Sequence, residues 1–185
     1  TTEIYTLSLH DALPISLEQI DSFSENSLVI VHHPLIFKPL KRVIYDTYPS
    51  NIIQKLIRKN ISLIAMHTNF DKYVLNSYVL KLLGFESQKC DLFIECEVNL
   101  DRQELFLRLS DTFRRDSFNF VNVPQFIKSI ALVCGSGSSF LEKMSADILI
   151  TGDLNYHASM SAISLDKGAI DIGHYELERF FAEAL

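Results

Sequence analysis

The feature that most constrains this 185-residue sequence is the alternation of short apolar runs with segments of helical spacing. Short apolar runs between turn signals are typical of buried strands, whereas apolar residues at i, i+3, i+4 and i+7 indicate amphipathic helices. Alternating strands and helices favour parallel pairing, because parallel neighbours need a crossover connection. We therefore predict an α/β fold: a layered sheet of mixed and parallel strands with helices on both faces.

The predicted strands are apolar runs bounded by polar or glycine residues. They cover residues 28–31, 61–66, 92–98, 118–123, 129–134, 148–150 and 169–172. The predicted helices place their apolar residues on one face, and one of them is followed by Gly84, a natural C-terminal cap. They cover residues 51–59, 76–82, 101–113, 138–144, 157–165 and 175–184.

The composition excludes several classes of protein. Hydrophobic residues make up 48% and charged residues 22% of the chain, which excludes a disordered protein. The net charge is -6 without a basic stripe, so no nucleic-acid partner is expected. The apolar runs are too short to cross a bilayer, so no membrane association is expected. Cys90, Cys96 and Cys134 are odd in number and form no CxxC pair, which favours a reducing, cytoplasmic environment.

Residues 1–15 read TTEIYTLSLHDALPI and resemble the in-frame translation of a sequencing-adapter oligonucleotide. They lack the basic n-region and apolar core of a signal peptide. We predict that residues 1–15 are an adapter-derived artefact and that residues 16–185 form a single, truncated domain. The alternative is a native strand, because residues 3–9 alternate loosely. If the segment is an artefact, we expect it to pack poorly or to occupy the place of a lost segment.

Polar, ligand-type side chains follow four of the predicted strands. His32 and His33 follow the first, His67 the second, Asp153 a later one and His174 the last. In open α/β sheets, ligands bind beyond the carboxyl ends of the strands. A single histidine at such a place is more often a packed or loop residue, but four strand ends together indicate a functional site.

Two spacings sharpen this hypothesis. His67 and Asp71 are four residues apart, as are His174 and Glu178, and on a helix such pairs share a face. Imidazoles and carboxylates without thiolates suit Zn, Mn, Fe or Co. The alternative for each pair is a surface contact. On an extended segment His32 and His33 point in opposite directions, so they are suited to hold two neighbouring ions or to straddle a bend at Pro34.

Several segments together resemble the GTP cyclohydrolase 1 type 2 homologue family, also called the Ngg-interacting-factor-three-like family. They are VHHPL, MHTNFD, VCGSG, TGD and GHYELE, which occur in this order between residues 31 and 178. The resemblance extends over nearly all of residues 17–185. It implies two divalent metal ions per chain (Zn, Fe, Mn or Co) and, in the intact family, a toroidal homohexamer.

Carried over motif by motif, the resemblance implies that His33, Asp71 and Glu178 hold one ion. His32 and His174 hold the other together with Glu178, which bridges the two. His67 lies beside the pair as a ligand or as a catalytic, proton-handling residue. The chain departs from the family in carrying Asp153 where a glutamate is usual, and in having no Trp. It also lacks the family's N-terminal strand and helix, so we expect a fragment.

These observations lead to the hypothesis of a metal-dependent hydrolase that acts on a small molecule, either nucleotide-like or a cyclic amide. A non-catalytic metal-binding scaffold or metal-handling protein is the alternative, and an interaction protein whose metals only maintain its assembly is a third. Residues 135–137 form either an anion-binding loop or a plain tight turn. Lys38, Lys41 and Arg42 either attract an anionic substrate or belong to a solvated loop.

Overall fold

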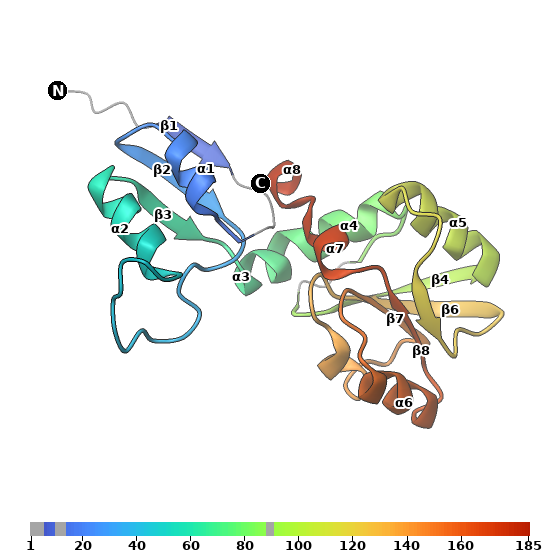
Figure 1. Ribbon diagram of the computed structural model, residues 1–185. Coiled ribbons are helices and arrows are strands. Elements are labelled where there is room, and N and C mark those ends of the chain that lie inside the picture. Colours follow the sequence, from blue (N-terminus) through green and yellow to red (C-terminus); the bar gives the residue numbers. More distant parts are fainter. Residues whose placement is uncertain (1–5, 10–13, 88–90) are drawn as a thin grey trace. The chain divides into compact units, whose positions relative to one another are not determined.

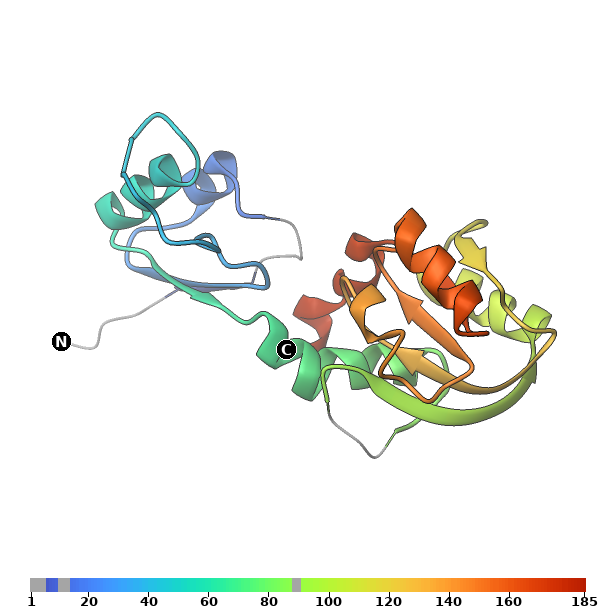
Figure 2. The same ribbon diagram turned by 90° about the horizontal axis from the view of Figure 1, so that it is seen from below.

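The computed structural model describes residues 6–9, 14–87 and 91–185 (Figure 1, and from below in Figure 2). Two compact units divide the chain between His67 and Thr68. That residues 16–185 form a single, truncated domain stays a prediction. Cys90 lies outside the described residues. Among the residues described, no helix is both long and apolar enough to cross a lipid bilayer.

The first unit contains a three-stranded parallel sheet in the order β1-β2-β3. Its strands are β1 (Thr6–Leu9), β2 (Ser27–Val31) and β3 (Ser62–Ala65), and its helices are α1 (Leu17–Ser22) and α2 (Ser50–Arg58). Ile20 of α1 and Ile52 of α2 share a core with Val29 and Val31 of β2. Both helices therefore cover the face of the sheet to which these two valines belong.

Helix α1 was missed by the sequence analysis, although it carries a helix-start signal. Ser16 and Gln19 form a capping box, in which the Gln19 backbone donates to Ser16 Oγ at 3.3 Å and the Ser16 backbone donates to Gln19 Oε1 at 2.6 Å. Such a box satisfies two backbone donors at the start of a helix. This signal lies directly after residues 1–15, the segment predicted to be an artefact.

The structure describes part of residues 1–15, the segment predicted to be an artefact. Residues 1–5 and 10–13 lie outside them, whereas Thr6–Leu9 form β1 and pair in parallel with β2 from Ser27 to Ile30. Ile15 is buried in the core of the first unit. These residues therefore take part in the fold, while the adapter origin of residues 1–15 stays a prediction.

The second unit contains a five-stranded mixed sheet in the order β4-β6-β7-β8-β5. The strands are β4 (Ile94–Asp101), β5 (Asn119–Val121), β6 (Phe126–Leu132), β7 (Ile148–Thr151) and β8 (Gly168–Asp171). The three inner strands are parallel, and each edge strand is antiparallel to its neighbour. The α/β fold with mixed and parallel strands is confirmed.

Helices lie on both faces of this sheet, as predicted (Figure 1). Helix α6 covers one face, and α4 and α5 lie on the other. The helical segments are α3 (Thr68–Phe70), the π-helical η1 (Asp71–Leu75), α4 (Asn76–Leu82), α5 (Arg102–Phe113), the 3₁₀-helical η2 (Ser138–Phe140), α6 (Tyr156–Ser164), α7 (His174–Glu178) and α8 (Phe181–Ala184).

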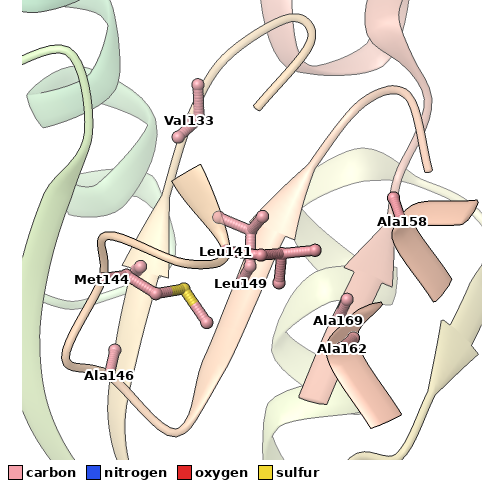
Figure 3. Close-up of a cluster of buried hydrophobic side chains, with 9 residues drawn as sticks. Val133, Leu141, Met144, Ala146, Leu149, Ala158, Ala162 and Ala169 are labelled. Carbon is pink, nitrogen blue, oxygen red and sulfur yellow. The ribbon is translucent and has the colours of Figure 1, made fainter. Parts of the chain in front are cut away.

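Both faces of the inner strands are buried, which explains their nearly continuous apolar sequence. Ala131, Leu149 and Ala169 are neighbours in register and belong to one apolar cluster with Ala158 and Ala162 of α6 (Figure 3). Successive side chains of a strand point to opposite faces. The intervening residues of the inner strands therefore belong to the opposite face, and they are buried as well. They include Ile130, Leu132, Ile148, Ile150 and Ile170.

Two predicted helices differ from the structure. The segment predicted at residues 175–184 is divided into α7 and α8, and the segment at residues 138–144 is only the short η2.

In α5, Leu105 and Leu109 are buried, whereas Leu107 is 65% exposed. Residues two apart do not share a helix face, so Leu107 cannot join the other two in the core.

We expect Leu149→Ala to lower the free energy of unfolding by about 2–5 kcal/mol, because it leaves a cavity in the cluster of Figure 3. Leu107→Ala, at an exposed position, is the matched control and should change stability by less than about 0.5 kcal/mol. Urea denaturation of both variants tests this expectation. Equal effects of the two substitutions would contradict the assigned core.

Candidate functional site

In the first unit, three histidines follow two neighbouring strands. Val31 of β2 is in register with Ala65 of β3, and the Met66 backbone donates to the Val31 carbonyl at 2.8 Å. Because β2 and β3 are parallel, their carboxyl ends lie at the same edge of the sheet. The residues after each strand are therefore brought together although they are far apart in sequence.

The three imidazole rings lie close to one another. The ring centroids are 4.9 Å apart for His32 and His33, 5.1 Å for His32 and His67, and 5.3 Å for His33 and His67. Each residue offers one ring nitrogen, and these nitrogens lie within 4.8 Å of one another. We call His32, His33 and His67 the histidine cluster; it could hold a metal ion.

The two adjacent histidines do not alternate across the sheet. Strand β2 ends at Val31, and His32 and His33 lie in a bend before Pro34. The alternation of side chains holds only for extended backbone, so the bend allows both rings to lie near His67. This arrangement corresponds to the predicted alternative in which the pair straddles a bend at Pro34.

In the second unit, His174 and Glu178 form the predicted pair on one helix face. They are the first and last residues of α7, and His174 Nε2 lies 2.9 Å from Glu178 Oε1. Gly173, with φ +101°, turns the chain from β8 into α7. The spacing of four residues therefore brings an imidazole and a carboxylate together, as the sequence indicated.

Asp153 is a third member of this group that the predicted ligand set left out. Its Oδ2 lies 2.7 Å from His174 Nδ1. A carboxylate on one imidazole nitrogen sets the tautomer and ring orientation, and the other nitrogen is then the one suited to bind a metal. The position of Asp153 two residues after the end of β7, which pairs with β8, was the available signal.

The hydrogen bonds and charges around His174 raise its pKa from 6.5 to about 9. The largest cause is the hydrogen bond to Glu178, and the hydrogen bond to Asp153 and the charges of both carboxylates add to it. Burial acts in the opposite direction, because it disfavours the charged imidazolium. Without a bound cation, His174 is therefore protonated at neutral pH and takes the place of a positive ion between two carboxylates.

Glu178 is a buried carboxylate whose position requires a glycine nearby. Its side chain is 2% exposed. Gly135 has φ +72°, and a Cβ atom there would lie 2.5 Å from Glu178 Oε1. A contact this short cannot be relieved at low cost, since Glu178 is buried. Gly135 therefore provides both the left-handed turn after β6 and the space that Glu178 occupies.

Asp71 lies in the second unit at the start of the π-helical segment η1. His67 precedes α3 and so lies outside the helical segment that contains Asp71, and the pairing of the two side chains stays a prediction. Burial, then the charges of Asp71 and Glu178, raise the pKa of the Cys134 thiol well above its usual range. Asp71 and Glu178 thus act on the same buried group, which indicates that these two predicted ligands lie in one neighbourhood.

Asn76 supports this neighbourhood and was also missed. It is fully buried at the start of α4, its Oδ1 accepts a hydrogen bond from the Cys134 backbone at 2.8 Å, and its Nδ2 donates to the Leu92 carbonyl at 3.2 Å. Asn76 therefore connects the helix that follows Asp71 with the turn that precedes Gly135. A buried amide within a helix gives little signal in sequence.

The loop of residues 135–137 has the contacts of a tight turn. The Gly137 backbone donates to Thr151 Oγ1 at 2.7 Å, and that hydroxyl donates to the Gly135 carbonyl at 3.0 Å. The Gly137 N–H is therefore used within the protein, which supports the tight-turn alternative over the anion-binding one. Lys38, Lys41 and Arg42 are exposed, as expected for the solvated-loop alternative.

The donor types in both units fit divalent cations. The first unit contributes three imidazoles, and the second contributes an imidazole and carboxylates. Nitrogen and oxygen donors of this kind suit Zn²⁺, Mn²⁺, Fe²⁺ and Co²⁺. Each predicted ligand belongs to one of the two units. Which ligands hold which of the two ions stays a prediction.

Comparison with known proteins gives matches over most of the chain. The profile of the Duf34/NIF3 (NGG1p interacting factor 3) family matches residues 10–185. A protein of Helicobacter pylori strain J99 named GTP cyclohydrolase 1 type 2 is 42% identical over 174 residues, covering 92% of this chain and 72% of that protein. A GTP cyclohydrolase 1 type 2 homolog of Campylobacter jejuni is 39% identical over 197 residues, covering 100% of this chain and 77% of that protein.

Solved structures support the fold. The crystal structure of the Staphylococcus aureus hypothetical protein SA1388 matches with a TM-score of 0.74 and 25% sequence identity. The match covers 92% of this chain and 74% of that chain. A Bacillus cereus protein related to NIF3 matches with a TM-score of 0.72 at 15% identity, covering 98% of this chain and 85% of that chain.

We expect Gly135→Ala to displace the Glu178 carboxylate, because the added Cβ occupies its place. Zn²⁺ affinity, measured by calorimetry, should fall tenfold or more, and the free energy of unfolding should fall by about 1–3 kcal/mol from backbone strain. Ser136→Ala in the same turn is the control and should change neither quantity appreciably. Unchanged Zn²⁺ affinity in Gly135→Ala would show that Glu178 is not a ligand.

The pKa of His174 predicts how stability depends on pH in the metal-free protein. A pKa raised from 6.5 to about 9 contributes stability that is fully present below about pH 6.5 and is lost as the pH rises through about 9. The stability advantage of the wild type over Glu178→Gln should therefore shrink across that interval. NMR titration should give a His174 midpoint near 9, lowered by both Glu178→Gln and Asp153→Asn. A wild-type midpoint near 6.5 would contradict the described contacts.

Proposed function

Since the chain belongs to the Duf34/NIF3 (NGG1p interacting factor 3) family, we propose that it is a metal-dependent hydrolase that binds two divalent ions per chain. The observation that carries this proposal is the His174 group. An imidazole lies between a buried carboxylate and an exposed one, at 2.9 and 2.7 Å, on the carboxyl side of parallel strands. This is the arrangement of an oriented metal ligand with its supporting carboxylate.

The proposed ligands follow the motifs. His33 and Asp71 would hold one ion, His32 and His174 would hold the other, and Glu178 would be a ligand of both. The proposal therefore requires residues of both units to act on the same pair of ions. Three protein ligands on each ion leave coordination positions for water and substrate.

When bound, such a pair of ions supplies Lewis-acid activation of water and of the scissile group. The protein's own residues do the remaining work. Asp153 orients His174 through Nδ1, Gly135 leaves space for the Glu178 carboxylate, and Asn76 fixes the turn that carries Gly135. His67 is the proposed proton carrier, because an imidazole can give and take a proton near neutral pH.

The proposed substrate is nucleotide-like or a cyclic amide. Support for the first comes from the Helicobacter pylori protein named GTP cyclohydrolase 1 type 2, which this chain resembles at 42% identity. Support for hydrolysis itself comes from the donor set, since two closely spaced ions suit displacement at phosphate and amide centres.

The experiment is a turnover assay of metal-loaded protein on a panel of nucleotides and cyclic amides. Zn²⁺, Mn²⁺, Fe²⁺ and Co²⁺ are loaded in turn, and we expect metal-dependent hydrolysis that falls at least about 100-fold in His33→Ala and Glu178→Ala. Glu142→Ala removes an exposed carboxylate outside the site and serves as the control. Bound metal without metal-dependent turnover of any substrate would support the non-catalytic scaffold instead.

A further inference from the structure

A polar cavity of about 330 Å³ lies beside His174, and Arg115, Asp153 and Asp171 are among the residues that line it. All of its described lining residues belong to the second unit. We propose that this cavity, the Arg115 cavity, binds the edge of a neutral cyclic amide, where a ring N–H stands next to a ring carbonyl. The inference rests on the proposed function and deepens it, because guanine-type bases and simple lactams both present this edge.

The Arg115 cavity lies at the carboxyl ends of the parallel strands β7 and β8. Gly152 and Asp153 come after β7, residues 171–174 lead from β8 into α7, and residues between 115 and 119 connect α5 with β5. In open α/β sheets, ligands bind at this end of the strands. The volume is near the lower end of the roughly 300–1,000 Å³ that is typical of small-molecule sites. The cavity therefore suits a single small ring system.

Arg115 supplies hydrogen-bond donors in a fixed position. Its Nη1 donates to the Ile172 carbonyl at 3.1 Å and lies 3.8 Å from Glu176 Oε1. Both contacts hold the guanidinium against the turn between β8 and α7. A guanidinium carries five N–H donors in a planar fork, so donors remain for a ligand carbonyl. A donor that is already held in place binds a ligand at a lower entropic cost.

Asp153 and Asp171 supply acceptors in the same cavity. Asp171 accepts backbone hydrogen bonds from Gly173 at 2.9 Å and from Leu154 at 3.2 Å, which fix its carboxylate. Asp153 Oδ2 lies 2.7 Å from His174 Nδ1, and the Asp153 side chain is 52% exposed. An ionised carboxylate has about four acceptor positions. Asp153 can therefore accept from a ligand N–H while it contacts His174.

The mixture of charges decides the class of ligand. A phosphate would be attracted by Arg115 but repelled by both carboxylates, and a cationic ligand would be repelled by Arg115. A neutral group with a donor beside an acceptor avoids both repulsions. Phe118 adds an aromatic wall for the ring, and its own ring is packed edge-on against Phe106 with the centroids 5.0 Å apart. Apolar walls with a few placed polar groups are typical of small-molecule sites.

Binding of small probes to the metal-free full chain tests the inference. Guanosine is the nucleoside probe and 2-piperidone is the lactam probe. Their N-methylated forms, 1-methylguanosine and 1-methyl-2-piperidone, lack the N–H and are the matched controls. We expect one or both parent compounds to shift the backbone NMR signals of Gly152 and Gly173, and the methylated partner to bind about tenfold or more weakly. Which parent binds distinguishes a nucleobase from a lactam as the source of the edge.

Two variants locate the binding. Arg115→Gln removes the guanidinium and should weaken binding of the parent compound about tenfold or more. Asn119→Phe, at an exposed lining position of the edge strand β5, narrows the cavity without touching the contacts of Arg115 and should weaken binding as well. Arg114→Gln changes the adjacent exposed arginine, which does not line this cavity, and should bind like the wild type.

Three results would overturn the inference. They are parent compounds that bind no better than their methylated partners, inorganic phosphate that shifts the Gly152 and Gly173 signals at lower concentration than either parent, and wild-type binding in both Arg115→Gln and Asn119→Phe. Metal-dependent turnover is measured separately. Binding in the cavity without turnover by the metal-loaded protein would overturn the proposed hydrolysis alone, whereas turnover without binding in the cavity would overturn this inference alone.

Discussion

Parallel pairing of neighbouring strands is the constraint on which the candidate site depends. It places the residues after β2 and β3 at one edge of the first sheet, and those after β7 and β8 at one edge of the second. His67 thereby lies beside His32 although 35 positions separate them in sequence. Asp153 lies beside His174 for the same reason, 21 positions apart. Each unit thus assembles its own donors from separate segments.

Burial of charge is the second constraint, and it explains why the group around α7 is built as it is. A buried carboxylate such as Glu178 is costly unless a cation or a hydrogen-bond donor accompanies it. His174 meets this need when it is protonated, and a metal ion would meet it when His174 is a neutral ligand. The same contact therefore stabilises the metal-free fold and competes with metal binding. Proton release on loading is the expected consequence.

The sequence was most informative where a local rule applied. The helical spacing of His174 and Glu178 predicted their contact, and strand-end positions predicted the grouping of His32, His33 and His67. The apolar pattern also predicted most of the strands and the order in which strands and helices follow one another along the chain. His67 lies just before α3, which continues as the π-helical η1, so its spacing to Asp71 is not that of one regular helix and their pairing stays a prediction.

What the sequence could not show depends on long-range packing. The roles of Asn76 and Gly135 arise from contacts with residues more than 40 positions away, to which no periodicity points. The break between α7 and α8 likewise depends on which surfaces meet in the folded unit.

An anomalous-difference map from a crystal of the zinc-loaded chain tests the central claim most directly. The account predicts two peaks about 3.5–4 Å apart, one bonded to His174 Nε2 and both to the Glu178 carboxylate. A map with no peak at His174 and Glu178, from protein shown to be folded and zinc-saturated, would contradict it.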